Sequence, residues 1–244
     1  MGDSNVAEIN LVTQEKGIWA KKLGEAQHMP VLLCLGGDEF TEQFSQIEQL
    51  LLSAIQKGEC RPFIVSSYLP QSWEIEYTPW PAPSLFKKAA SFEGGAEETL
   101  SWTLKDWIPH VITMFGLQES KTEFYCMGYS LAGLCALWML HESTRFSGCV
   151  CCSGSLWYDN WVDYINGHEV PCRNSRIYLS LGDEEANARN KRMAQVGENT
   201  RLTYEKLVAD SNVSHIVFQL NQGGHFTDVA NRQAKAIQWL MQNP

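Results

Sequence analysis

The feature that most constrains the fold is a regular alternation of short apolar runs with longer amphipathic ones. Val31–Leu35 reads VLLCL and ends at two glycines, and apolar residues from Glu39 to Lys57 then recur at helical spacing. Further strands are predicted at Arg61–Ser67, Glu123–Met127, Phe146–Cys152, Arg176–Leu181 and His215–Leu220. Further helices are predicted at Ala96–Phe115, Leu131–His141, Ala188–Asp210 and Ala230–Met241. Nearly continuous apolar strands that alternate with helices indicate an α/β fold, a mostly parallel sheet with helices on both faces.

Length and charge narrow the classes of protein and partner. A chain of 244 residues, 44% hydrophobic and 19% charged, is expected to form one domain over residues 1–244. Residues 1–29 are then an N-terminal lead-in that can add an edge strand. The net charge of −9 argues against a nucleic-acid partner. The start lacks a secretory signal, and no apolar run reaches the roughly 20 residues of a membrane span. We therefore predict a cytoplasmic protein with no membrane partner.

Cysteine usage points to packing rather than to disulfides or metal. Most of the cysteines lie within apolar strand-like or helix-like runs, where reduced thiols act as small hydrophobic groups. The eight are Cys34, Cys60, Cys126, Cys135, Cys149, Cys151, Cys152 and Cys172. No further CxxC pair accompanies the cluster at 149–152, so we predict neither a metal site nor a cofactor.

The sharpest local signal is GYSLAG at residues 128–133, between a predicted strand and a predicted helix. A strand that turns sharply into a helix holds its central residue, Ser130, in strained backbone geometry with the side chain above the sheet. Gly128 and Ala132 flank it as small residues, as the close approach of strand and helix requires. The sequence therefore predicts a nucleophile elbow at Ser130. The alternative is a turn of small residues with an inert serine.

A serine nucleophile needs a base and an acid, which follow it in the chain order Ser…acid…His. His225 follows the last predicted strand and two glycines that let its loop fold back, although it could also merely cap the final helix. The strand RIYLSL is followed by three candidate acids: Asp183, Glu184 and Glu185. A carboxylate there would orient the imidazole of His225 and stabilise its charged form.

Two backbone N–H groups are candidates for stabilising a negatively charged oxygen. One belongs to Leu131, the residue after the nucleophile, at a helix N-terminus. The other lies in the turn LGGDEF, where Gly36 and Gly37 allow close backbone approach, and we place it at Gly37. The turn could also serve only to join a strand to a helix.

The loops around this site are aromatic, and there is no room for a cap domain. Only residues 153–175 lie between two central strands where a cap is usually inserted, enough for one short helix. Aromatic walls suit a planar or bulky apolar acyl group. Tyr129, Trp80 and Trp157 are the expected substrate contacts, although such rings can equally pack the loops down.

Taken together, these segments resemble the α/β-hydrolase superfamily, and more narrowly the esterase family of esterase D and the enterochelin esterases. Beyond GYSLAG, the resemblance rests on SGSLWYD at 153–159, SLGDEEANARN at 180–190 and NQGGHF at 221–226. It implies a serine hydrolase acting on small-molecule carboxylic esters. Carried onto this sequence, Ser130 matches the nucleophile, His225 the general base and Glu185 the acid of the Gly-x-x-acid turn.

Two departures and two alternatives qualify that reading. Ala132 stands in place of the second elbow glycine, and no arginine-rich recognition of a catecholate siderophore is evident. If the acid contributes weakly, Ser130 and His225 form a dyad. The same residues could serve an acyltransferase, and the fold could also belong to an inactive binding protein.

Overall fold

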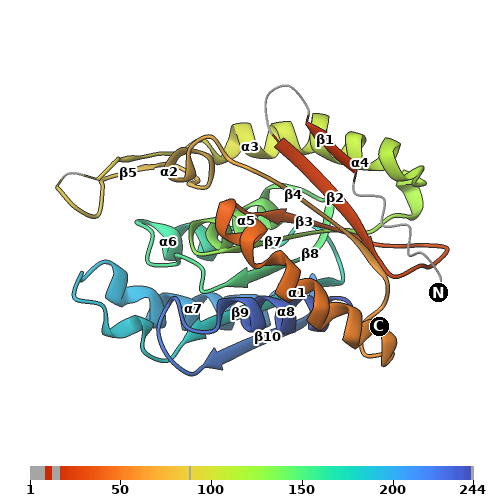
Figure 1. Ribbon diagram of the computed structural model, residues 1–244. Coiled ribbons are helices and arrows are strands. Elements are labelled where there is room, and N and C mark those ends of the chain that lie inside the picture. The colour runs from red at the N-terminus through yellow and green to blue at the C-terminus, as the bar shows by residue number, and fades with distance from the viewer. Residues whose placement is uncertain (1–8, 13–16, 88, 243–244) are drawn as a thin grey trace.

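The computed structural model describes residues 9–12, 17–87 and 89–242. Its described residues form an eight-stranded sheet in the order β1-β2-β4-β3-β7-β8-β9-β10 (Figure 1). The sheet is parallel from β4 to β10, and β1 and β2 add antiparallel strands at one edge. The strands are β1 Ile9–Val12, β2 Gly17–Leu23, β3 Val31–Leu35, β4 Phe63–Tyr68, β7 Phe124–Tyr129, β8 Phe146–Cys152, β9 Ser175–Gly182 and β10 Val213–Asn221. The predicted α/β class is confirmed.

Helices cover both faces of the sheet (Figure 1). Two separate clusters of buried apolar residues form the cores of the molecule. On one face α1 (Asp38–Gln56) packs beside α8 (Val229–Leu240). The opposite face carries the other long helices: α3 Ala96–Trp102, the π-helical segment Thr103–Trp107, α4 Ile108–Phe115, α5 Leu131–Glu142, α6 Trp161–Gly167 and α7 Val196–Val208. Short 3₁₀ turns occupy Glu119–Lys121, Glu185–Asn187 and Met193–Gln195.

Helix α5 is enclosed at the centre of the molecule. Every residue from Leu131 to His141 is buried, which fits an apolar sequence with no polar face. A helix that is apolar all round must be enclosed on every side. It packs on β3, β7 and β8, and it therefore fixes the turn that precedes it.

The loops above the carboxyl ends of the strands are local. After β4, the segment holds α2 (Trp73–Glu76) and a small hairpin of β5 (Pro81–Ala82) and β6 (Phe92–Glu93). Between β8 and β9, residues 153–174 contain the short helix α6 and no cap domain. The connection between β8 and β9 therefore adds no cap over the site, as expected.

All eight cysteines are free, and only Cys172 is more than marginally exposed. Burial raises the pKa of the Cys60 and Cys152 thiols to about 12, and it raises that of Cys34 as well. Since the thiolate is the reactive form, these groups should be inert in the native protein. We expect a thiol reagent to label Cys172 quickly and all eight after denaturation without reductant. Two or more disulfides in the purified protein would contradict this prediction.

In the described part of the chain, no helix is long and apolar enough to cross a membrane. The cytoplasmic location stays a prediction.

Candidate active site

The turn between β7 and α5 has the strained geometry of a nucleophile elbow. Ser130 has φ 61° and ψ −125°, a region that residues with a side chain rarely adopt. Holding a residue there costs on the order of 1–3 kcal/mol, and such strain is typical of functional positions. The burial of α5 on one side and β7 on the other supplies the constraint.

The small residues around Ser130 are required by close packing. A Cβ atom at Gly128 would lie 2.2 Å from the carbonyl carbon and oxygen of Ala132, so no side chain fits there. At Gly133 a Cβ would lie 3.0 Å from the Gly128 oxygen and 3.2 Å from that of Cys152. Strand and helix nearly touch at this point, as the GYSLAG motif predicts.

His225 and Glu185 come together beyond the ends of β10 and β9. Nδ1 of His225 lies 2.7 Å from Oε2 of Glu185. The Glu185 side chain is 5% exposed and that of His225 is 29% exposed, so the carboxylate is sealed while the ring faces the site. The hydroxyl of Tyr129 donates to the backbone oxygen of His225 at 2.6 Å, which ties the histidine loop to the elbow.

The other oxygen of Glu185 is held by separate donors. Oε1 accepts hydrogen bonds from the Ser153 hydroxyl and from the backbone N–H of Gly182, each at 2.7 Å. The guanidinium of Arg232 approaches the same oxygen at 3.6 Å. Burial works to raise the pKa of the Glu185 carboxyl, but the hydrogen bond and charge of His225, with the Ser153 and Gly182 donors, outweigh it and lower that pKa.

This lowered pKa predicts a pH-dependent contribution to stability. The Glu185 carboxylate should stabilise the fold fully above its ordinary pKa of 4.5, and this stabilisation should be lost as pH falls through the lower folded value. Urea unfolding of wild type and Glu185→Gln across this range measures the effect. The difference in unfolding free energy should shrink as the pH falls below 4.5. A difference that grows with acidification would contradict the prediction.

The neighbouring carboxylates take other positions. Asp183 is exposed and accepts the backbone N–H of Gly223 at 2.7 Å, which fastens the start of the histidine loop to β9. Glu184 is exposed to solvent. Of the three candidate acids, only Glu185 contacts the ring of His225.

Three residues of this network escaped the sequence reasoning. Arg232 is 3% exposed and joins Glu185, the Tyr129 hydroxyl at 3.4 Å and the Gln222 backbone oxygen at 2.9 Å. An arginine within the apolar stripe of the last helix was the available signal. Ser153 and Ser155 lie in the SGSLWYD motif, and Oγ of Ser155 is 3.4 Å from Oγ of Ser130. The sequence of that motif does not distinguish these two hydroxyls from other serines.

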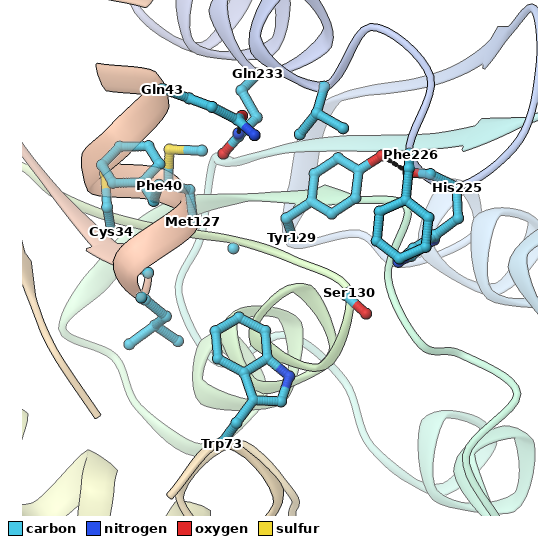
Figure 2. Close-up of a pocket in the computed structure, with 15 residues that line it drawn as sticks. Cys34, Phe40, Gln43, Trp73, Met127, Tyr129, Ser130, His225, Phe226 and Gln233 are labelled. Atoms are coloured by element: carbon cyan, nitrogen blue, oxygen red, sulfur yellow. Dashed lines mark hydrogen bonds between the residues drawn. The ribbon is translucent and has the colours of Figure 1, made fainter. Parts of the chain in front are cut away.

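A cavity of about 690 Å³ opens beside the elbow (Figure 2). Ser130, His225, Tyr129 and Gly37 line it, so these predicted site residues share one space. Its walls also include Cys34, Leu35, Gly36, Phe40, Gln43, Trp73, Met127, Gly128, Phe226, Val229 and Gln233.

The aromatic lining differs from the expectation. Trp80 and Trp157 are not among the residues that line this cavity. The indole N–H of Trp80 instead donates to the Asp159 backbone oxygen at 2.8 Å, and Trp157 is buried against Phe92. These two rings hold loops from the two halves of the chain together. Trp73 supplies the aromatic wall beside the elbow.

The two expected oxyanion donors lie at neighbouring strand ends. Leu35 of β3 pairs in register with Gly128 of β7, so the Gly36–Gly37 turn stands next to the elbow. Leu131 begins α5, and its N–H therefore has no acceptor within the helix. Gly37 lines the cavity, whereas Leu131 is buried and is not among the lining residues.

The described residues contain no set of side chains suited to binding a metal ion. No group of three or more His, Cys, Asp or Glu side chains there could hold a metal ion. The cluster at Cys149, Cys151 and Cys152 is buried in β8 among core residues.

Strand order, elbow and site together define an α/β-hydrolase fold. A family model described as "Putative esterase" matches residues 21–227. The chain belongs to this esterase family and is a carboxylic ester hydrolase.

Other proteins are similar to this chain in sequence or in fold. The uncharacterized protein YbbA of Bacillus subtilis is 25% identical over 200 residues, which cover 80% of each chain. The siderophore hydrolase EstA of Aspergillus nidulans superimposes with a TM-score of 0.71 at 17% identity, over 93% of this chain and 89% of that one. An IroE-like serine hydrolase of Shewanella oneidensis gives 0.75 at 15% identity, over 93% and 75%. These two structures share the fold.

Proposed function

We propose that this esterase cleaves its substrates through an acyl-enzyme on Ser130, with His225 as general base and Glu185 as the orienting acid. The observation that carries the proposal is the 2.7 Å contact between Nδ1 of His225 and the buried Glu185 carboxylate, beside a strained serine in the same cavity. A carboxylate that holds Nδ1–H leaves Nε2 unprotonated and able to accept a proton.

The chemistry then follows in two halves. Nε2 of His225 accepts the proton of the Ser130 hydroxyl while Oγ attacks the ester carbonyl and a tetrahedral intermediate forms. The charged imidazole gives that proton to the departing alkoxide as the carbon–oxygen bond breaks. A water molecule, deprotonated by the same Nε2, then attacks the acyl-enzyme, and the carboxylic acid leaves as Ser130 regains its proton.

The backbone N–H groups of Leu131 and Gly37 are assigned to the developing oxyanion. Both precede or begin helices, α5 and α1, whose N-terminal ends favour negative charge. Such preorganised donors are worth about 3–4 kcal/mol each in related chemistry.

The substrates we propose are small-molecule esters. Proteins of similar fold are named as siderophore hydrolases and an enterobactin esterase. The absence of a cap between β8 and β9 leaves an open approach to the cavity. Which ester is cleaved depends on the cavity walls.

Covalent labelling tests the assignment of the nucleophile. A fluorophosphonate should modify the protein once, and peptide mapping should place the adduct on Ser130. Because Oγ of Ser155 lies only 3.4 Å away, the mapping must separate these two serines. An adduct on Ser155, or no adduct on a protein that turns over p-nitrophenyl acetate, would refute the mechanism. Product analysis with and without added alcohol separates hydrolysis from acyl transfer.

A further inference from the structure

Two glutamine side chains from different helices meet in the wall of the cavity. Nε2 of Gln233, on α8, donates to Oε1 of Gln43, on α1, at 3.3 Å (Figure 2). Gln233 is 3% exposed, whereas Gln43 is half-buried. A carboxamide offers two N–H donors and an oxygen with two lone pairs, so one hydrogen bond uses only part of this capacity. The pair can therefore serve a ligand that enters the cavity.

The surroundings of this glutamine pair, Gln43 and Gln233, are apolar. Phe40 and Met127 lie beside it, and Trp73 stands at the opposite side of the cavity (Figure 2). Ser130 lies away from the pair in the same view, beyond Tyr129. A substrate held at Ser130 thus crosses an apolar stretch before it reaches a polar group.

The described wall of the cavity near the glutamine pair carries no carboxylate, ammonium or guanidinium group. Among its described lining residues there is no Asp, Glu, Lys or Arg. An ionised group held at the glutamine pair would lose its hydration without meeting a side chain of opposite charge among the described lining residues there, which is unfavourable. A neutral polar group would instead meet the donors and acceptors of the glutamine pair.

We infer that the substrate is an uncharged ester whose apolar, aromatic body ends in a carboxamide that hydrogen-bonds Gln43 and Gln233. This inference rests on the proposed function, because it places the scissile carbonyl at Ser130. A carboxamide presents both a donor and an acceptor, as the pair does, so the two surfaces complement each other. The volume of about 690 Å³ accommodates a group of this size.

Matched substrates test the inference. The probes are p-nitrophenyl esters of aryl-alkanoic acids with one to three methylenes and a para carbamoyl, isopropyl or carboxylate group. For the best chain length, kcat/KM for the carbamoyl ester should exceed that for the isopropyl ester by about tenfold, as one or two neutral hydrogen bonds allow. The carboxylate ester should be the poorest. Equal rates for carbamoyl and isopropyl esters at every length would overturn the inference.

Variants identify the residues responsible. Gln233→Leu and Gln43→Leu should each bring the carbamoyl-to-isopropyl ratio to about one. Gln238→Leu on α8 and the exposed Gln46→Leu on α1 are matched controls that should keep it. Gln43 is only half-buried, so its variant still gives an answer if Gln233→Leu does not fold. A ratio unchanged in Gln43→Leu and in any folded Gln233→Leu protein would refute the role of the pair.

A binding measurement separates this inference from the mechanism. Ketone analogues, in which a methylene replaces the ester oxygen, cannot be hydrolysed, and calorimetry reports their affinities directly. The carbamoyl ketone should bind about tenfold tighter than the isopropyl ketone even if Ser130 is not the nucleophile. Normal turnover of p-nitrophenyl acetate without this preference would refute the substrate class alone. Preference without labelling of Ser130 would refute the mechanism alone.

Discussion

Replacing Ser130 by alanine is expected to lower kcat/KM for ester turnover by roughly 10³-fold or more. The change removes the attacking oxygen but leaves the Cβ atom, so the backbone keeps its φ of 61° and its packing. The hydroxyl makes a 3.4 Å contact with Ser155, which is too weak to matter for folding. Steady-state kinetics on p-nitrophenyl and aryl esters, with the unfolding temperature of both proteins, measures the effect.

Nearly unchanged thermal stability is the internal control for this substitution. A well-folded Ser130→Ala protein that still turns over esters at more than a tenth of the wild-type rate would end the assignment of Ser130 as nucleophile. The nearby hydroxyl of Ser155 would then be the first alternative.

Replacing Glu185 by glutamine is expected to lower kcat by about 10²- to 10⁴-fold. Oε1 accepts hydrogen bonds from Ser153 and Gly182, so the amide oxygen of the new residue should occupy that position. The NH₂ group then faces Nδ1 of His225, which can only accept from it. The ring proton would move to Nε2, and the base would be unable to take a proton from Ser130. Kinetics with saturating substrate measures the loss.

The adjacent carboxylates supply matched controls. Asp183→Asn retains an oxygen that can accept from Gly223, and Glu184→Gln alters an exposed side chain, so each should change kcat by less than about tenfold. If Asp183→Asn proves the crippling change, the acid is misassigned. If none of the three substitutions matters, the enzyme works through a Ser130–His225 dyad.

The central strands could be predicted from the sequence with their bounds, whereas an edge strand could be predicted only as an option within residues 1–29. Val31–Leu35 and Phe146–Cys152 are strands with the predicted bounds, because buried parallel strands are apolar throughout. Within that lead-in, the segment Gly17–Leu23 does join the sheet and pairs antiparallel with β4, but the sequence does not mark its bounds. Its alternate residues Gly17, Trp19 and Lys21 are half-buried and Lys22 is exposed, so its sequence does not resemble that of the buried strands.

In the site, too, features that depend on one short segment could be predicted, and features that depend on contacts between distant segments could not. The small residues around Ser130 follow from one turn, and the sequence displays them together. Whether Trp73, Trp80 and Trp157 line the cavity depends on how loops from the two halves of the chain pack together. The hydrogen bond from Trp80 to Asp159 is one such contact. A local sequence pattern does not depend on such contacts. The sequence therefore could not predict which aromatic loop residues line the cavity and which pack against other loops.

The use of α8 as a wall of the site has a consequence for biogenesis. Arg232 and Gln233 lie on the last described helix, and the contact between Tyr129 and His225 spans 96 positions of the chain. On the ribosome, the elbow emerges long before its base and before the helix that fastens the acid. Under the proposed mechanism, a nascent chain thus carries a serine that has no partner to activate it, and hydrolysis is expected only after α8 docks. The moment at which ester turnover appears during translation would therefore report the docking of α8 and not the formation of the sheet.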